Sequence, residues 1–186
     1  MNKEQEAWIE KIKDNYGEFQ NVPKALVTEE FCLAAVQNNG SALRYVPEEL
    51  KTEALCMTAF QKRPLTVLLD DVPENLRTEA ICVEAAISYD LNLNYMPKEI
   101  KEKESFWSAV IKERGNLLED VPDELMTEAM CLDAVQQRGD MLEDVPKKLR
   151  TEAVCIAAVK QEENAMQWVP KALKAKVEAA LKEEKR

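Results

Sequence analysis

A Val-Pro or Met-Pro dipeptide recurs seven times along this 186-residue chain at nearly constant spacing. The prolines are Pro23, Pro47, Pro73, Pro97, Pro122, Pro146 and Pro170, which lie 24, 26, 24, 25, 24 and 24 residues apart. A fixed period of this length is typical of stacked structural units that each contact their neighbours, rather than of one globular core. The sequence therefore constrains the architecture of the protein more strongly than its function.

Each repeat carries a helix start and an apolar helix face at a fixed distance from its proline. Thr-Glu comes five and six residues after the proline in five repeats, as in Thr28-Glu29, and cysteine comes nine residues after it. Threonine is a favourable helix N-cap, and glutamate suits the first turn of a helix. Positions eight, nine, twelve and thirteen are apolar, which predicts a main helix of about twelve residues with one buried face, such as residues 28–39.

Alanine occupies position twelve of six repeats, where we expect neighbouring main helices to touch because small side chains allow close packing. These alanines are Ala35, Ala59, Ala85, Ala109, Ala134 and Ala158. Gly40, Gly115 and Gly139 come just after three of the main helices, where we expect a left-handed C-cap. The stretch around each proline is too short for a second full helix, so it predicts short helical or 3₁₀ turns.

Together these features predict an all-α fold. We expect an α-solenoid of six to seven short repeats, each with one main helix and a short helical or 3₁₀ turn, in one elongated domain. Residues 1–20 are expected to form an N-terminal capping half-repeat, residues 21–170 six tandem repeats, and residues 171–186 a C-terminal amphipathic capping helix. Such end units give a stack of repeats its polar outer faces.

Charge and hydropathy limit the classes of partner. The chain has 35 acidic and 25 basic residues and a net charge of −10, whereas nucleic-acid binders need clustered positive charge. Its apolar runs are far shorter than the roughly 20 residues of a membrane-spanning helix. The N-terminus has no apolar stretch of the signal-peptide type. We therefore expect no nucleic-acid or membrane partner, and a cytoplasmic protein.

The five cysteines do not follow a metal-binding or disulfide pattern. No two of them are closer than 24 residues, and the chain has no histidine, so zinc ligation of ordinary spacing is not expected. Either they are buried, free thiols that act as small apolar side chains, or one is an exposed redox sensor. The sequence also lacks a histidine base, a phosphate-binding glycine loop and a nucleophile elbow, so we expect neither a cofactor nor an enzyme.

The residue two positions before each proline is the main candidate for partner binding. It is acidic in three repeats and aromatic in three others: Asp71, Asp120 and Asp144, and Tyr45, Tyr95 and Trp168. The aspartates either cap the following turn or form an acidic row for a basic partner. The aromatic residues either anchor a partner or close gaps between repeats. Trp107, in the irregular fourth repeat that lacks the Thr-Glu and cysteine pattern, is a further candidate.

The repeat pattern resembles an uncharacterised family of short tandem helical repeats from bacteria and some protists, known only as a domain of unknown function. The stretches that carry the resemblance are 46–56, which reads VPEELKTEALC, and 151–159, which reads TEAVCIAAV. The shared pattern is VPxxLxTExxC, and it covers about residues 20–174. The resemblance implies a helical-repeat architecture and carries no activity or catalytic residues.

A stack of repeats offers a long surface, so the expected function is that of a non-catalytic scaffold that binds another protein. The alternative is an acidic inhibitor that masks a basic surface of its partner. The sequence leaves the oligomeric state open.

Overall fold

The computed structural model describes residues 1–62 and 67–183, and the regular structure of these residues is entirely helical. The predicted all-α class is therefore confirmed. The contacts divide the chain into two compact units, Met1–Ile100 and Lys101–Arg186. The domain boundaries expected after residues 20 and 170 remain predictions.

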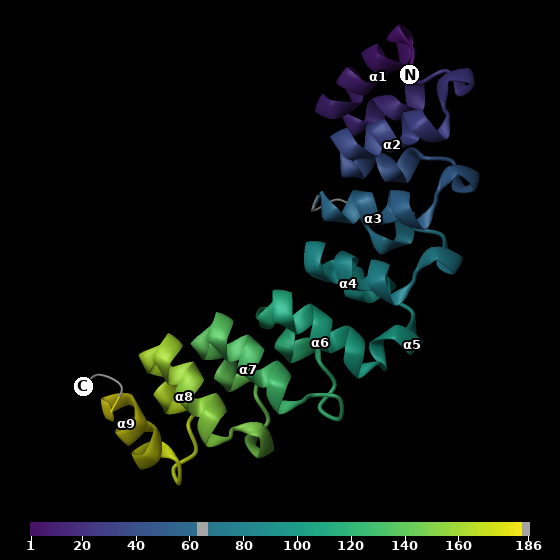
Figure 1. Cartoon of the computed structure of the whole chain (residues 1–186). Helices are drawn as coiled ribbons and strands as arrows, with labels where there is room; N and C mark the ends of the chain where they lie inside the picture. Colours follow the sequence, from purple (N-terminus) through teal and green to yellow (C-terminus); the bar gives the residue numbers. More distant parts are fainter. Residues whose placement is uncertain (63–66, 184–186) are drawn as a thin grey trace. The chain divides into compact units, whose positions relative to one another are not determined.

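In the first unit four main helices pack in chain order, each against the next. They are α1 (Lys3–Asp14), α2 (Glu29–Asn38), α3 (Glu53–Gln61) and α4 (Glu79–Ser88). The connecting segments are η1 (Tyr16–Asn21), η2 (Lys24–Leu26), η3 (Gly40–Tyr45), η4 (Glu48–Leu50), η5 (Leu69–Asp71), η6 (Glu74–Leu76) and η7 (Asp90–Tyr95). The short α5 (Lys98–Lys101) includes the last residues of this unit and the first residue of the second. These short segments line one side of the row of main helices (Figure 1).

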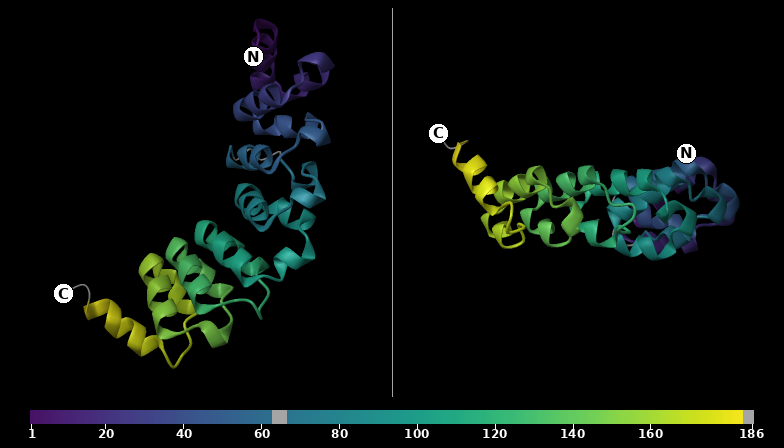
Figure 2. Two further views of the ribbon diagram at one scale, coloured as in Figure 1. Left: turned by 45° about the vertical axis from the view of Figure 1, so that its right-hand side comes forward. Right: turned by 90° about the horizontal axis from the view of Figure 1, so that it is seen from below.

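The second unit has the same organisation, with α6 (Glu104–Glu113), α7 (Glu128–Gln137), α8 (Glu152–Gln161) and α9 (Lys174–Glu183) packed in chain order. Its short segments are η8 (Gly115–Asp120), η9 (Gly139–Glu143), η10 (Lys147–Leu149) and η11 (Glu163–Gln167). The views in Figure 2 show these segments beside the main helices to which they connect. The helix expected over residues 171–186 begins at Lys174, and residues 184–186 lie outside the described part.

The Thr-Glu pair starts each regular main helix, and in two repeats it also links that helix to the one before. The hydroxyl oxygen of Thr151 accepts a hydrogen bond from the Val154 amide at 3.3 Å, which is the predicted N-cap. The same hydroxyl donates to the Glu128 carboxylate in the first turn of α7, at 2.7 Å. Thr78 likewise donates to Glu53 at 3.0 Å. The recurrence of the pair thus has two causes, one local and one between helices.

The predicted apolar face is buried in the regular repeats. In α2 the residues Phe31, Cys32, Ala35 and Val36 are all fully buried. Each proline begins a short turn as expected; the Leu50 amide, for example, donates to the Pro47 carbonyl at 3.0 Å.

In the fourth repeat the alanine at position twelve is not at a helix contact as expected, because Ala109 is exposed. The segment after Pro97 forms an α-helical turn, α5, and it is one residue longer than its counterparts, since the helix cap is Lys103 at position six instead of five. The residues three, four, seven and eight positions after the cap are buried, as they are in α2, so the buried face shifts with the cap by one position. The buried residues are consequently Phe106, Trp107, Val110 and Ile111, and Val110 takes the place that alanine has elsewhere.

The expected left-handed C-caps at Gly115 and Gly139 are wrong, because neither glycine has a positive φ. The helix C-caps are Arg114 and Arg138, whose φ values of −135° and −147° lie outside the left-handed region. Glycine is needed here for space. A Cβ on Gly115 would lie 2.8 Å from the Cα of Ala134 in the next main helix. The alanine at position twelve, Ala134, and the glycine after the preceding main helix, Gly115, therefore form one close contact. Gly40 likewise starts a 3₁₀ segment, after the extended C-cap Asn39.

Candidate functional site

The structure does not gather the candidate residues into one site. Tyr45, Asp71 and Tyr95 belong to the first unit, and Trp107, Asp120, Asp144 and Trp168 to the second. Tyr45, Asp71 and Trp168 are half-buried, whereas Tyr95, Asp120 and Asp144 are exposed. Six of the seven therefore reach the surface, each at the end of a 3₁₀ segment or next to one.

Trp107 is not available to a partner, which corrects the expectation for this residue. Its side chain is 2% exposed, packs edge-on against Phe106 with ring centroids 5.0 Å apart, and donates from Nε1 to the Lys101 carbonyl at 2.8 Å. The Cys82 and Cys155 thiols point in the same way to the carbonyls of Arg77 and Arg150, both at 3.7 Å. Trp107 thus replaces the cysteine of the regular repeats, and its indole N–H replaces the thiol.

The backbone of the candidate positions holds consecutive turns together. The Arg150 guanidinium donates to the Val145 carbonyl and to the Trp168 carbonyl, both at 2.8 Å. Arg77 donates in the same way to the Val72 carbonyl at 2.9 Å and to the Tyr95 carbonyl at 3.3 Å. Lys51 reaches the Asp71 carbonyl. We call these basic side chains, four residues after their proline, the clamp residues.

The Asp71 side chain has a structural role as well. Its carboxylate accepts from the Leu68 amide at 3.2 Å, at the start of the segment η5 that ends in Asp71, and from Nε of Arg44 at 3.2 Å. The carboxylate beside it raises the pKa of Arg44. The turn that follows Pro73, η6, has no side-chain cap, so the expected capping of the following turn is wrong for Asp71, and its carboxylate stabilises the preceding segment η5 instead.

Asp144 lies in a more acidic environment. Partial burial raises the pKa of its carboxyl, and the nearby charges of Glu119, Glu143 and Asp140 raise it further, against a smaller opposite effect of Arg138. Like charges disfavour the ionised form. This edge of the second unit therefore carries a concentrated negative potential.

Tyr45 closes part of the space between two turns. Its ring stacks on that of Tyr16, with centroids 6.1 Å apart and an angle of 26° between the planes. Tyr95, in the same position of a later repeat, is 38% exposed. Aromatic residues at this position thus differ in environment.

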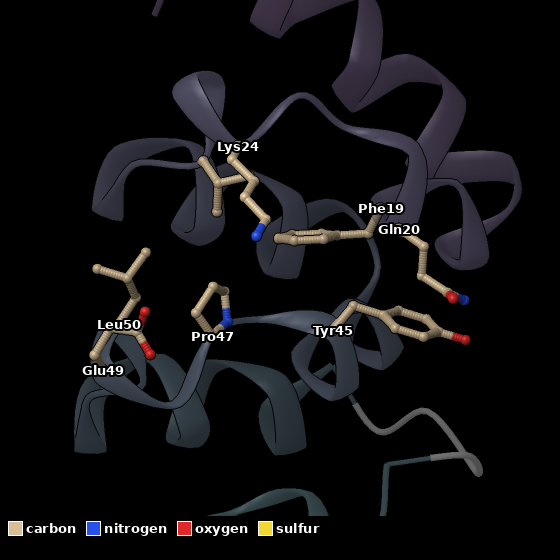
Figure 3. Close-up of a pocket in the computed structure, with 8 residues that line it drawn as sticks. Phe19, Gln20, Lys24, Tyr45, Pro47, Glu49 and Leu50 are labelled. Carbon is tan, nitrogen blue, oxygen red and sulfur yellow. The ribbon is translucent and has the colours of Figure 1, made fainter.

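A groove of about 600 Å³ lies between the first two turns, next to Tyr45. Figure 3 shows Phe19, Gln20 and Lys24 along one wall, and residues of the following turn along the other. The lining residues are Phe19, Gln20, Lys24, Val27, Tyr45, Pro47, Glu49 and Leu50. The walls are mainly apolar and aromatic, with a carboxylate and an ammonium group at the rim.

A second set of surface side chains, which the sequence analysis missed, lies on the main helices of each unit. Position ten of every regular repeat is apolar yet partly exposed: Leu33, Met57, Val83, Leu132 and Ile156. Leu33 is 40% exposed and lines a groove of about 340 Å³ between α2 and α3. Leu132 and Ile156 line one of about 380 Å³ between α7 and α8. The sequence did contain a signal for this surface. Positions eight, nine, ten, twelve and thirteen are all apolar, and a single buried helix face does not need all five.

The cysteines are buried and free, as the first of the two alternatives predicted. Burial raises the pKa of Cys32, Cys56 and Cys131 to about 11, and it also raises the pKa of Cys155. Nearby backbone donors and Lys51 or Arg150 oppose this effect only in part. A redox sensor needs an exposed thiol of low pKa, and these four have the opposite properties.

Within residues 1–62 and 67–183, no three metal-binding side chains come together in a group that could hold an ion. No helix in the same ranges is long and apolar enough to cross a bilayer.

Comparison with known proteins matches one stretch of the chain. The model of a family described as "Domain of unknown function (DUF4116)" matches residues 28–77, which begin at the cap of α2 and include α3, η3 and η4. The resemblance to an uncharacterised family is thus confirmed for this stretch. No curated protein and no solved structure matches the chain.

Proposed function

We propose that each unit is a short stretch of α-solenoid and that the chain is a non-catalytic scaffold that binds another protein along its main helices. The observation that carries the proposal is the row of partly exposed apolar side chains at position ten. Leu33 in the first unit and Leu132 in the second each line a groove between adjacent helices. Stacked helices commonly use such repeated grooves for binding.

The exposed parts of these apolar side chains contribute no hydrophobic free energy to folding, because they stay in contact with water. Each buried CH₂ group contributes about 0.8 kcal/mol on transfer from water. A partner helix that covers Leu132 and Ile156 in the groove between α7 and α8 would recover this free energy. Small neighbours such as Ala153 and Ala157 leave room for it.

Variants at position ten test this proposal against matched variants on the same helices. Leu33→Glu with Leu132→Glu places charges in both grooves, and Gln37→Glu with Ala129→Glu places the same charges at exposed positions of α2 and α7 that line neither groove. Partners are captured from native lysate by photo-crosslinking and identified by mass spectrometry. We expect capture of specific partners that the leucine variants lose and the control variants keep. Equal capture by both double variants, or no enriched partner, would contradict the proposal.

The acidic-inhibitor alternative rests on the edge around Asp144, where desolvation and then the nearby charges of Glu119, Glu143 and Asp140 raise the pKa of its carboxyl. A basic partner surface would relieve this repulsion. In that case complex formation would weaken steeply with salt, and Asp144→Asn would weaken it too. Insensitivity of the captured complexes to salt would favour docking on the apolar grooves.

A further inference from the structure

We propose that the groove between the first two turns of the first unit binds an arginine side chain presented by a partner. The inference rests on the proposed function, because it names one chemical feature of the partner and the place that recognises it. The groove differs from the spaces between other consecutive turns in the side chain that stands at the clamp position.

The clamp position explains why the groove is open. Four residues after each of the first six prolines stand Val27, Lys51, Arg77, Lys101, Met126 and Arg150. Three of these side chains, Lys51, Arg77 and Arg150, cross to the next turn and donate to a backbone carbonyl there. Met126 is long, and it is buried. Val27 is the shortest side chain of the six, and it carries no donor.

The volumes of two equivalent grooves are consistent with this explanation. Where Arg77 occupies the clamp position, the space beside Tyr95 and Pro97 is about 400 Å³. Where Val27 occupies it, the space beside Tyr45 and Pro47 is about 600 Å³. The larger groove is left where the cation is missing.

The groove keeps the features that hold the internal guanidinium groups. The Tyr45 carbonyl corresponds in position to the Tyr95 and Trp168 carbonyls, which accept from Arg77 and Arg150. Phe19, Tyr45 and Pro47 supply apolar and aromatic walls for the planar group and its aliphatic stem (Figure 3). Glu49, at the rim, supplies the opposite charge.

Lys24 is the group that competes with such a ligand. Figure 3 shows its ammonium beside the Phe19 ring, on the side that faces Pro47, and within the described part of the chain the ammonium makes no hydrogen bond or ion pair. It therefore does not replace the missing clamp, and it repels an incoming cation. We expect Lys24→Ala to tighten binding of an arginine side chain.

The test is a titration of the whole ¹⁵N-labelled chain with N-acetyl-arginine amide, followed by amide chemical shifts. We expect saturable shifts confined to residues near the groove, such as Tyr45 and Leu50, and none with the uncharged citrulline analogue. Val27→Arg should fill the site from within and weaken binding more than about 10-fold, and Glu49→Gln should weaken it several-fold. Val27→Ala leaves the groove open and should retain binding. Thermal unfolding of each variant verifies that it is folded.

Equal shifts with the citrulline or an N-acetyl-aspartate amide probe would overturn the proposal, as would unchanged binding in Val27→Arg. Failure of the broader function is a separate outcome. If the position-ten variants lose their partners while no arginine probe binds, the scaffold stands and the groove proposal falls. If the probe binds but lysate yields no partner, the scaffold proposal falls instead.

Discussion

A Cβ atom on Gly139 would lie 2.4 Å from the carbonyl oxygen of Ala158, which is closer than side-chain carbons approach other atoms. The oxygen belongs to the backbone of α8, so it cannot move without displacing the helix. This contact sets how closely η9 approaches α8. It also explains why glycine stands at this position although its φ is not positive.

Gly139→Ala is therefore expected to destabilise the protein. Overpacking against backbone costs about 1–3 kcal/mol, which outweighs the gain of about 0.4–1 kcal/mol from a less flexible unfolded chain. The measurement is chemical denaturation with a helix signal. Gly17→Ala is the matched control, because its Cβ would meet only the Asn15 side chain, at 3.1 Å. An equal change in both variants would show that space at Gly139 is not limiting.

Ala134→Leu and Ala109→Leu should differ although both alanines stand twelve residues after a proline. Ala134 is fully buried beside Gly115, so a leucine overpacks the helix contact and costs about 1–3 kcal/mol. Ala109 is exposed, and surface substitutions usually stay within about 0.5 kcal/mol. Thermal unfolding of the two variants measures the difference. An unchanged Tm for Ala134→Leu would contradict the packing described for α7.

Trp107→Phe removes the hydrogen bond to the Lys101 carbonyl while keeping an aromatic ring in the core. A buried acceptor left without its donor costs about 1–3 kcal/mol, so we expect a lower Tm. Trp168→Phe is the control, since the Trp168 contact to Arg150 uses the backbone carbonyl and survives the change. Because Trp107 is buried, partner capture by the folded variant should be unaffected. Selective loss of a partner would reinstate Trp107 as a binding residue.

Arg150→Met should loosen the link between two turns of the second unit. The variant keeps the aliphatic stem but leaves the Val145, Trp168 and Glu143 carbonyls without this donor. Hydrogen bonds to charged groups contribute about 1.5–3 kcal/mol each when buried, and partial exposure here reduces the expected total to about 1–3 kcal/mol. Lys148→Met, at an exposed position, controls for the lost charge. Equal stability of the two variants would argue that the clamp contributes nothing.

Buried thiols should make the protein less stable in alkali. The pKa of Cys56 is raised to about 11 in the folded state, against about 8.5 in an unfolded chain. The folded state therefore holds the proton more tightly, so its advantage is complete below about pH 8.5 and is lost as the pH rises toward 11. The expected loss is on the order of 1–2 kcal/mol per thiol. Urea unfolding between pH 8 and 10.5 measures it, and Cys56→Ala should show a shallower decline. Parallel declines in both proteins would mean that this thiol is not linked to folding.

The spacing of residues along the sequence was sufficient to predict the helix starts and the buried helix faces of the regular repeats. The distance from proline to threonine predicted where each regular helix begins, and the apolar positions after it predicted the buried cysteines and the face of α2. Both are properties of a single helix and its cap, which depend on neighbours along the chain. The short turns around proline follow from the same local restrictions on its backbone.

Features that depend on contacts between helices could be seen only in the tertiary structure. One additional residue before α6 shifts its cap and its buried face by one sequence position, so that Trp107 is buried in place of cysteine and Ala109 is exposed. Gly139 is glycine because α8 comes close, and Val27 leaves a groove because no clamp side chain crosses it. The phase of a helix and the distance to its neighbour arise only when the helices pack, since the sequence pattern fixes which side chains share a face but not what that face meets.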